Sequence, residues 1–499
     1  MRIIYFDMDC TRPDHLGVYG YPRPTSPVLD ELAKTSVVFD NCFASDTPCL
    51  PSRAALFSCR PGIANGVVSH EWPGCNFRFP ARPGMAQYYP EYEMPMRLLQ
   101  RHGYHTITFS VFAQRHLAWW FNAGFSEVSN PSAPHGHENS QTINPRVVDW
   151  LRHNVKRTEN LFMHINYWDA HTTYRPDRGC RDRVAASPAP PFPDAALIRN
   201  HFENVYGPKT ARDIMIRMGG EYRSPTEYMP DEIRDRDTYT HMLDSYDGCI
   251  ATVDKAIGEI VDVLREQGVY DDTAIIVSAD HGEAIAQMGM YFEHGVAVDG
   301  VAHVPLIVRW PGVTDHGGRC DAMVYQYDFM ATIMEMLGIE RPGCWDARSL
   351  APALRGDTCD GYPYVVYGCG IFSLQRAVRT REYAYVKTFN SGCLPLDNTY
   401  LFDIRHDPEQ TLDIKHDNRS VVAEMERLYA EWWGRWCTGP DAVIDPMHLQ
   451  TPGFAYFPPE EMLARLEYCG RPDQIADLKR RLQHDRRNIP LSLLSMSNY

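Results

Sequence analysis

Cys49 stands at the expected start of a helix, within the segment 47–53. Pro51 suits the first turn of a helix and residues 54–57 favour helix formation, so the helix should begin beside Cys49. Free backbone N–H groups and the positive end of the helix dipole favour an anion or an anionic nucleophile at that point. Arg53, about one turn further on, adds positive charge. The pattern indicates a reactive cysteine in an anion-binding pocket, and the alternative is a small buried cysteine beside a helix cap.

Acidic residues follow two of the expected buried strands. The apolar run 2–6 leads to Asp7 and Asp9, and a later apolar run leads to Asp280 and His281. Alternation along a strand places Asp7 and Asp9 on one side, at the carboxyl end where α/β proteins bind ligands. Two like charges held that close repel unless a cation or a proton lies between them. Carboxylate oxygens favour calcium, magnesium or manganese, so we expect a divalent cation there.

The elements that would position these residues follow an α/β pattern. Short apolar runs of the kind buried in parallel sheets recur, for example at 105–109 and 161–168. Residues 237–267 carry apolar side chains at helical spacing and should form a packing helix. Residues 176–236 hold a polar, proline-rich insertion of the kind that often borders an active site. A chain of 499 residues exceeds the usual limit of one core, so we expect one large and one small domain.

The segment 49–53 resembles the C-x-P-S-R signature of type I sulfatases, in which the cysteine is oxidised after synthesis to formylglycine. Residues 9–21 resemble the opening of that family, and residues 400–409 resemble its close. The resemblance covers most of the chain. It implies an α/β, alkaline phosphatase-like fold with a large, mostly parallel sheet flanked by helices and a smaller C-terminal α+β subdomain with an antiparallel sheet.

The same resemblance implies a division of the chain into three parts. These are a catalytic domain at 1–365, a small subdomain at 366–440 and a C-terminal extension at 441–499. The extension could dock on the same chain or on a second subunit, so a homo-oligomer is one of two alternatives.

The resemblance also assigns the metal ligands. They are Asp7, Asp9, Cys49 (as formylglycine), Asp280 and His281. Many sulfatases carry two adjacent aspartates at the first position, where this chain has Met8. Asp7 would substitute from two positions back, and the alternative is that it is a polar strand end. We expect calcium, with manganese or magnesium as alternatives.

Further residues match substrate-binding positions of the family. Arg53 would hold the hydrated nucleophile, His171 would contact the sulfate and His294 would protonate the leaving oxygen. Sulfatases commonly carry Gly-Lys-Trp-His after one strand, and this chain has Ser-Val-Phe-Ala at that place. Arg115 and His116 would supply the missing cation and donor, and the alternative is that both are surface helix residues.

The resemblance implies a formylglycine-dependent sulfatase, which we expect to act on a sulfated carbohydrate. A phosphonate monoester or phosphodiester hydrolase of the same superfamily is the first alternative, and cleavage of an N-sulfate is the second. A non-catalytic member that binds sulfated glycans is the third.

Composition limits the classes of molecule that this protein could bind. The net charge of −15 and pI near 5.7 argue against nucleic acid, and no apolar run reaches transmembrane length. The 14 cysteines show no zinc spacing, and the chain opens directly on a strand, without a signal peptide. We therefore expect a cytoplasmic protein whose Cys49 is oxidised by a formylglycine-generating or anaerobic sulfatase-maturating enzyme.

Overall fold

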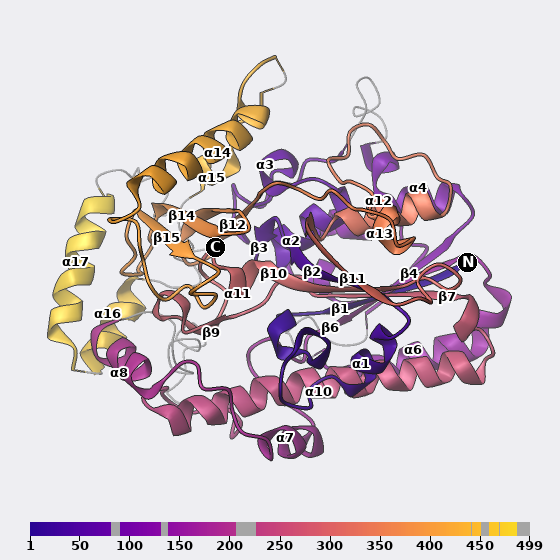
Figure 1. The fold of residues 1–499 in the computed structure, drawn as a ribbon, viewed down its shortest axis with the longest axis horizontal. Helices are drawn as coiled ribbons and strands as arrows, with labels where there is room; N and C mark the ends of the chain where they lie inside the picture. The colour runs from indigo at the N-terminus through magenta and orange to yellow at the C-terminus, as the bar shows by residue number, and fades with distance from the viewer. Residues whose placement is uncertain are drawn as a thin grey trace.

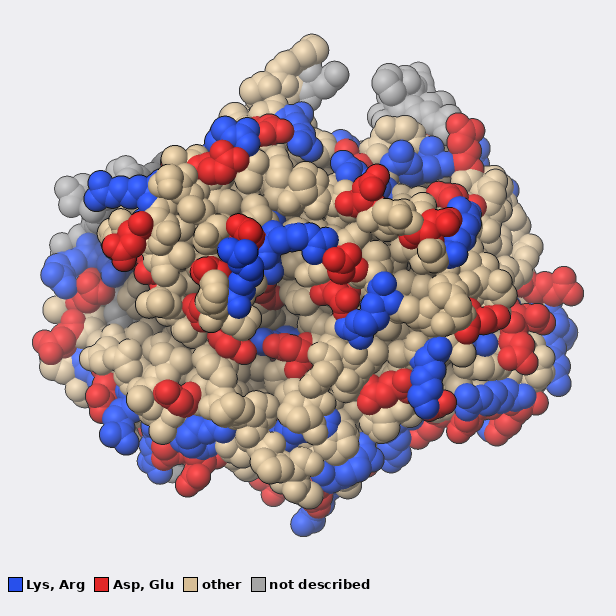
Figure 2. Space-filling view, in the orientation of Figure 1, with Lys and Arg blue, Asp and Glu red and all other residues tan. Residues whose placement is uncertain are grey.

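The computed structural model describes residues 1–80, 90–130, 138–205, 226–440, 442–450, 459–468 and 470–486. Within these residues the chain forms a large sheet with helices on both faces and a smaller sheet beside it (Figure 1). This architecture confirms the predicted α/β fold class. On the face seen in Figure 2, basic and acidic side chains are interspersed around a central hollow, so the negative net charge does not form one continuous patch there.

The large sheet is mostly parallel, as predicted. Its strands are β1 (Arg2–Met8), β2 (Val37–Phe43), β4 (His105–Phe109), β5 (Glu127–Ser129), β6 (Leu161–Tyr167), β7 (Thr273–Ser278), β10 (His303–Arg309) and β11 (Gly318–Tyr325). They are arranged in the order β11-β2-β10-β7-β1-β6-β4-β5. Strand β10 is antiparallel to β2 and β7, and the other neighbouring pairs are parallel.

Helices cover both faces of this sheet. Those named below are α1 (Pro27–Ala33), α2 (Cys49–Ser58), α6 (Ser140–Asn154), α10 (Arg236–Glu266), α12 (Asp328–Met336) and α13 (Ala351–Leu354). Figure 1 shows α2, α12 and α13 on one side of the sheet and α1, α6 and α10 on the other.

Alternating residues of β1 explain the two layers. Ile3 and Tyr5 belong to the buried cluster that contains the residues of α2, whereas Ile4 and Phe6 belong to the cluster that contains the residues of α10. Successive side chains of a strand point to opposite faces, so an uninterrupted apolar run is buried on both.

Helix α10 matches the predicted packing helix within one residue at each end. Its N-cap Asp235 accepts a hydrogen bond from the backbone N–H of Thr238, whose side chain in turn bonds to the backbone of Asp235. This reciprocal cap satisfies two donors that would otherwise lack partners and fixes the start of the helix.

The smaller sheet contains β3 (Asp46–Thr47), β12 (Val365–Gly370), β13 (Leu374–Arg379), β14 (Tyr383–Asn390) and β15 (Thr399–Asp403), in the order β15-β14-β13-β12-β3. Strand β3 pairs in parallel with β12, and the remaining pairs are antiparallel. Because β3 leads directly into α2, the small sheet borders the segment that carries Cys49. The division at residues 365 and 440 stays a prediction.

The insertion and the tail also contain helices. The described part of the insertion forms α7 (Arg178–Ala185) and α8 (Ala195–Asn204), and residues 206–225 lie outside the described residues. In the tail, α16 (Pro459–Tyr468) and α17 (Pro472–Arg486) pack in one cluster with Cys393 of the same chain. None of the described helices combines the length and the apolar character that crossing a membrane requires.

Candidate active site

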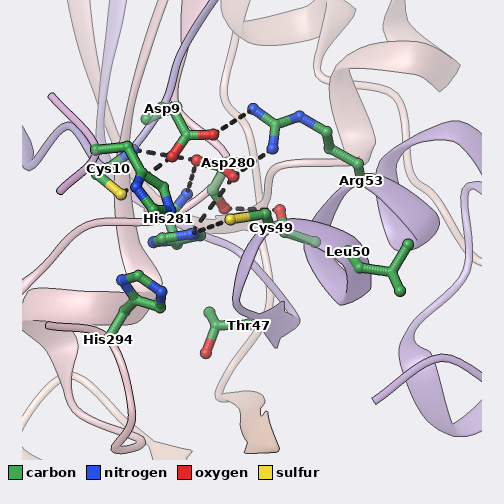
Figure 3. Close-up of polar contacts among 12 residues, drawn as sticks. Asp9, Cys10, Thr47, Cys49, Leu50, Arg53, Asp280, His281 and His294 are labelled. Atoms are coloured by element: carbon green, nitrogen blue, oxygen red, sulfur yellow. Dashed lines mark hydrogen bonds and ion pairs between the residues drawn. The ribbon is translucent and has the colours of Figure 1, made fainter. Parts of the chain in front are cut away.

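The ends of β1 and β7 bring two carboxylates together. The strands are adjacent and parallel, with Asp7 opposite Ser278. Asp9 and Asp280 each follow these paired residues by two positions, so both lie at the same carboxyl edge of the sheet. Cys49 is the first residue of α2, as predicted, and Figure 3 shows its side chain directed toward the same point.

Four of the predicted metal ligands meet at this edge. The potential ligand atoms of Asp9, Cys49, Asp280 and His281 all lie within 4.8 Å of one another, and all four residues are buried. The Cys49 Sγ atom lies 3.2 Å from Nε2 of His281. Nδ1 of His281 lies 2.9 Å from the carbonyl oxygen of Gly282, so its N–H donates there and the lone pair of Nε2 faces Cys49.

Arg53 binds three carboxylates at once. Its Nε donates to Asp7 at 2.7 Å, its Nη1 to Asp280 at 2.6 Å and its Nη2 to Asp9 at 2.9 Å. Each of these side chains is at most 1% exposed. The guanidinium therefore fixes the three acidic side chains, and its hydrogen bonds among the described residues go to them rather than to Cys49.

The remaining charge fits a divalent cation. One guanidinium faces three buried carboxyl groups, so acidic side chains outnumber basic ones in this group. Burial raises the pKa of Asp280 to about 7, with Arg53 opposing this shift and Asp9 adding to it. Burial likewise raises the pKa of Asp9. Carboxylate oxygens suit calcium, magnesium or manganese, whereas an imidazole nitrogen suits transition metals, so the residues present fit a divalent cation without selecting one of these ions.

Asp7 lies apart from the other four predicted ligands, and its role as a metal ligand stays a prediction. It lies within β1, two residues before Asp9, and this step of about 6–7 Å along a strand sets its carboxylate deeper in the sheet. Its Oδ2 accepts from Arg53 and lies 3.3 Å from Nε2 of His164. Asp7 is therefore not a member of the four-residue group, and its Oδ2 instead accepts a hydrogen bond from Arg53.

His294 lies beside the four-residue group and can act as a proton donor. Its ring centroid is 4.5 Å from that of His281, and its Nδ1 is 3.3 Å from Oε2 of Glu283. Burial lowers the pKa of His294, but the neighbouring carboxylate of Glu283 outweighs burial and raises the pKa to about 9. The imidazolium form is thus the stable one at neutral pH.

The Cys49 thiol is not activated as a thiolate. Burial raises its pKa, and the carboxylates of Asp9 and Asp280 raise it further, while Arg53 opposes them. The helix N-terminus is therefore insufficient to favour an anionic sulfur in this acidic environment.

Arg115, His116 and His171 gather around the ring of Trp168. The guanidinium of Arg115 lies 4.2 Å from the ring centroid, and the rings of His116 and His171 lie 6.1 and 5.4 Å from it. His171 also approaches His294, with 5.6 Å between ring centroids. Nη1 of Arg115 and Nε2 of His116 are buried and have no hydrogen-bond partner among the described residues. These donors suit an anion, and the surface-helix alternative does not describe them.

His70 belongs to the same group, and the sequence did not reveal it. The backbone N–H of Leu50, next to Cys49, donates to His70 Nε2 at 3.3 Å. The ring of His70 lies 4.7 Å from that of His116. His70 comes from a glycine- and proline-rich segment without periodicity, so only its residue type could have marked it.

Comparison with known proteins decides the family. The sequence profile described as Sulfatase matches residues 2–339, about two thirds of the chain. The chain belongs to the sulfatase family. It is a sulfuric ester hydrolase of the alkaline phosphatase-like superfamily, as the sequence predicted. A second profile, described as N-sulphoglucosamine sulphohydrolase, C-terminal, matches residues 289–431 of this sulfatase.

Curated relatives of the sulfatase are distant but extensive. It is 22% identical to an N-acetylglucosamine-6-O-sulfatase of Bacteroides thetaiotaomicron, over 86% of each protein. It is also 22% identical to an ulvan-active sulfatase of Formosa agariphila, over 80% of this chain and 75% of the relative.

Solved structures share the fold. A putative sulfatase from Bacteroides thetaiotaomicron has a TM-score of 0.66 at 20% identity, covering 91% of this chain and 97% of that one. A phosphonate monoester hydrolase of Agrobacterium radiobacter has a TM-score of 0.62 at 18% identity, covering 87% and 95%.

Proposed function

We propose that this sulfatase hydrolyses a sulfate ester on a carbohydrate, using formylglycine formed from Cys49 and a divalent cation, with calcium expected. The observation that carries the proposal is the meeting of Asp9, Cys49, Asp280 and His281 within 4.8 Å. The carbohydrate is supported by relatives named for N-acetylglucosamine and ulvan.

The proposal adds two groups, a divalent cation and the formylglycine formed from Cys49. Asp9, Asp280 and His281, with the modified Cys49, would hold the cation, which supplies Lewis acidity and lowers the pKa of the nucleophile. The hydrate of formylglycine supplies a hydroxyl nucleophile, whereas the protonated thiol of Cys49 would be a weak one. Because Cys49 is only 1% exposed, the maturating enzyme would act before α2 is buried.

The chain's own residues would bind and orient the sulfate. Arg115 offers a buried guanidinium nitrogen that has no hydrogen-bond partner in the described part of the chain, and His116 and His171 offer ring nitrogens beside it. Trp168 holds the Arg115 side chain by stacking under its guanidinium. These residues would replace the lysine and histidine that the family commonly carries after the strand that corresponds to β4.

His294 would protonate the oxygen that leaves with the sugar. The sugar alcohol is a poor leaving group, so a positioned acid is required. The carboxylate of Glu283 raises the pKa of His294 to about 9, and the His294 ring lies 4.5 Å from that of His281, which contacts Cys49; both observations support this role.

A substrate panel tests the function. Purified protein is assayed on glucosamine and galactose sulfated at defined oxygens, on the matching N-sulfated sugars and on aryl sulfate and aryl phosphonate esters. The proposal predicts the highest kcat/KM on an O-sulfated sugar. Activity on the phosphonate ester alone would contradict it.

A phosphonate monoester hydrolase is the second candidate. The observation that favours it is His281 at the metal site, together with the fold shared with the phosphonate monoester hydrolase. The aryl phosphonate arm of the panel decides between the two. The N-sulfate arm tests the alternative suggested by the C-terminal profile, and binding without turnover in modified, metal-loaded protein would support a glycan-binding role.

A further inference from the structure

Cys320 and Cys359 are partly exposed cysteines remote from the four-residue metal group. Cys320 lies on β11, the edge strand of the large sheet, and Cys359 lies in the segment 355–364 that joins α13 to β12 (Figure 1). Both side chains pack in part against the main buried cluster and remain partly accessible to solvent. Both thiols are free.

The two segments make contact within three residues of these cysteines. The backbone N–H of Tyr362 donates to the carbonyl of Met323 at 2.7 Å. Gly361 approaches Ala322 so closely that a Cβ at this glycine would lie 2.9 Å from the Cβ of Ala322. Residues 322 and 361, 323 and 362, and finally 320 and 359 are all separated by the same 39 positions.

Gly361 makes this approach possible. Its φ is +60°, which side chains rarely adopt, and it has no Cβ to strike the carbonyl of Met323. Residues 361 and 362 therefore contact β11, and the thiols of Cys320 and Cys359 lie close enough for each to shift the pKa of the other.

We propose that Cys320 and Cys359 form a disulfide when the protein meets a hydroperoxide, and that this bond ties the edge of the large sheet to the segment entering the small sheet. The pair has the features of a peroxide-sensitive site, which are partial exposure, thiolate character and an adjacent second thiol.

With hydrogen peroxide as the oxidant, the two thiols and one peroxide molecule give one disulfide and two molecules of water. The neighbouring thiol of Cys320 lowers the pKa of Cys359 to about 6, against the effect of burial, so Cys359 is the attacking thiolate. Its sulfur takes one peroxide oxygen as the O–O bond breaks and hydroxide leaves, which gives a sulfenic acid. The Cys320 sulfur then attacks Cys359, the S–S bond forms, the S–O bond breaks and the second water leaves.

Peptide mapping tests the bond directly. The full-length protein is treated with hydrogen peroxide, free thiols are alkylated, and tryptic peptides are sequenced by mass spectrometry without reduction. We expect a cross-linked product that joins Cys320 to Cys359 and disappears with dithiothreitol. Alkylation of both residues after peroxide treatment would overturn the proposal.

Matched serine variants test which thiol reacts and what the bond does. In Cys320→Ser, dimedone should label Cys359 after peroxide, whereas in Cys359→Ser it should leave Cys320 unlabelled. Oxidation should raise the thermal midpoint of the wild type and of the control Cys344→Ser, but not of the two pair variants. An equal rise in all four proteins, or no rise in the cross-linked wild type, would overturn the proposed tie.

Discussion

Nε2 of His281 lies 3.2 Å from Sγ of Cys49, although 232 residues separate them in the chain. The contact joins the end of β7 to the start of α2, and Arg53, one turn along α2, binds the carboxylates on the other side (Figure 3). The position of Cys49 is therefore fixed both by the carboxyl edge of the large sheet and by helix α2.

Arg53→Lys should destabilise the protein strongly. Lysine cannot donate to three carboxylates in fixed directions, so Asp7, Asp9 and Asp280 would lose partners in a buried site. We expect a loss of about 3–5 kcal/mol in the free energy of unfolding, measured by urea denaturation. Arg60→Lys is the control, since Arg60 makes one partly exposed ion pair with Asp346. Equal losses in the two variants would contradict this role for Arg53.

Removal of divalent cations should lower the thermal midpoint and the activity, and calcium should restore both. A cation that binds the folded protein and not the unfolded chain stabilises it by mass action. In Asp280→Asn the midpoint should no longer respond to calcium, because one ligand of the group is neutral. A midpoint that responds equally in both proteins would place the cation elsewhere.

His294→Gln should slow poor leaving groups far more than good ones. Loss of a general acid costs roughly 10²- to 10⁴-fold in kcat when the leaving alcohol needs a proton. A sugar sulfate should show this loss, whereas 4-nitrophenyl sulfate should be much less affected. His303→Gln is the control, because its ring nitrogen bonds to the carbonyl of Asp40. The same loss on both substrates would indicate a structural role for His294.

Arg115→Gln should weaken recognition of the sulfate. Its guanidinium lies over Trp168 with a buried nitrogen that has no hydrogen-bond partner among the residues described, and removing one such donor costs about 10²–10³-fold in rate. Steady-state kinetics and competition by inorganic sulfate measure the loss. The neighbouring exposed Gln114→Ala is the control. Unchanged inhibition by sulfate in Arg115→Gln would remove Arg115 from the sulfate site.

The ion pair of Arg376 with Asp445 should make stability depend on acid. Both side chains are 1% exposed. Burial raises the pKa of Asp445, but Arg376 outweighs it and holds the pKa below its ordinary value. A depressed pKa stabilises the folded state above the ordinary aspartate pKa of about 3.9, and this contribution is lost as the pH falls through the folded pKa.

Asp445→Asn should therefore lower the free energy of unfolding by about 3–5 kcal/mol at neutral pH, because it leaves Arg376 unpaired and buried. The difference from the wild type should shrink as the pH falls below about 4. Asp397→Asn removes an exposed partner of Lys415 and should cost about 0–1 kcal/mol. A difference for Asp445→Asn that stays constant down to low pH would contradict the linkage.

Much of the site could be predicted because its residues follow regular elements. Asp9 and Asp280 come after apolar strands, and Cys49 begins a helix, so their positions at the carboxyl edge follow from periodicity. The depth of Asp7 could not be predicted in the same way. It depends on the place of the Arg53 guanidinium, which belongs to another element.

Long-range pairing accounts for what the sequence did not show. Residues 46–47 pair with β12, whose residues lie more than 300 positions later, and no local pattern marks two strand residues. His70 reaches the active site from a segment without periodicity. The contacts of residues 361 and 362 with β11 likewise join segments that are distant in the sequence.

The central claim is that an aldehyde at position 49, and no thiol, performs the hydrolysis. Mass spectrometry of the tryptic peptide ending at Arg53 gives the fraction of chains that carry the aldehyde, and the same preparations are assayed on a sulfated sugar. The account predicts activity proportional to that fraction and none in Cys49→Ala. Full activity in protein whose residue 49 is entirely thiol, or is alanine, would contradict it.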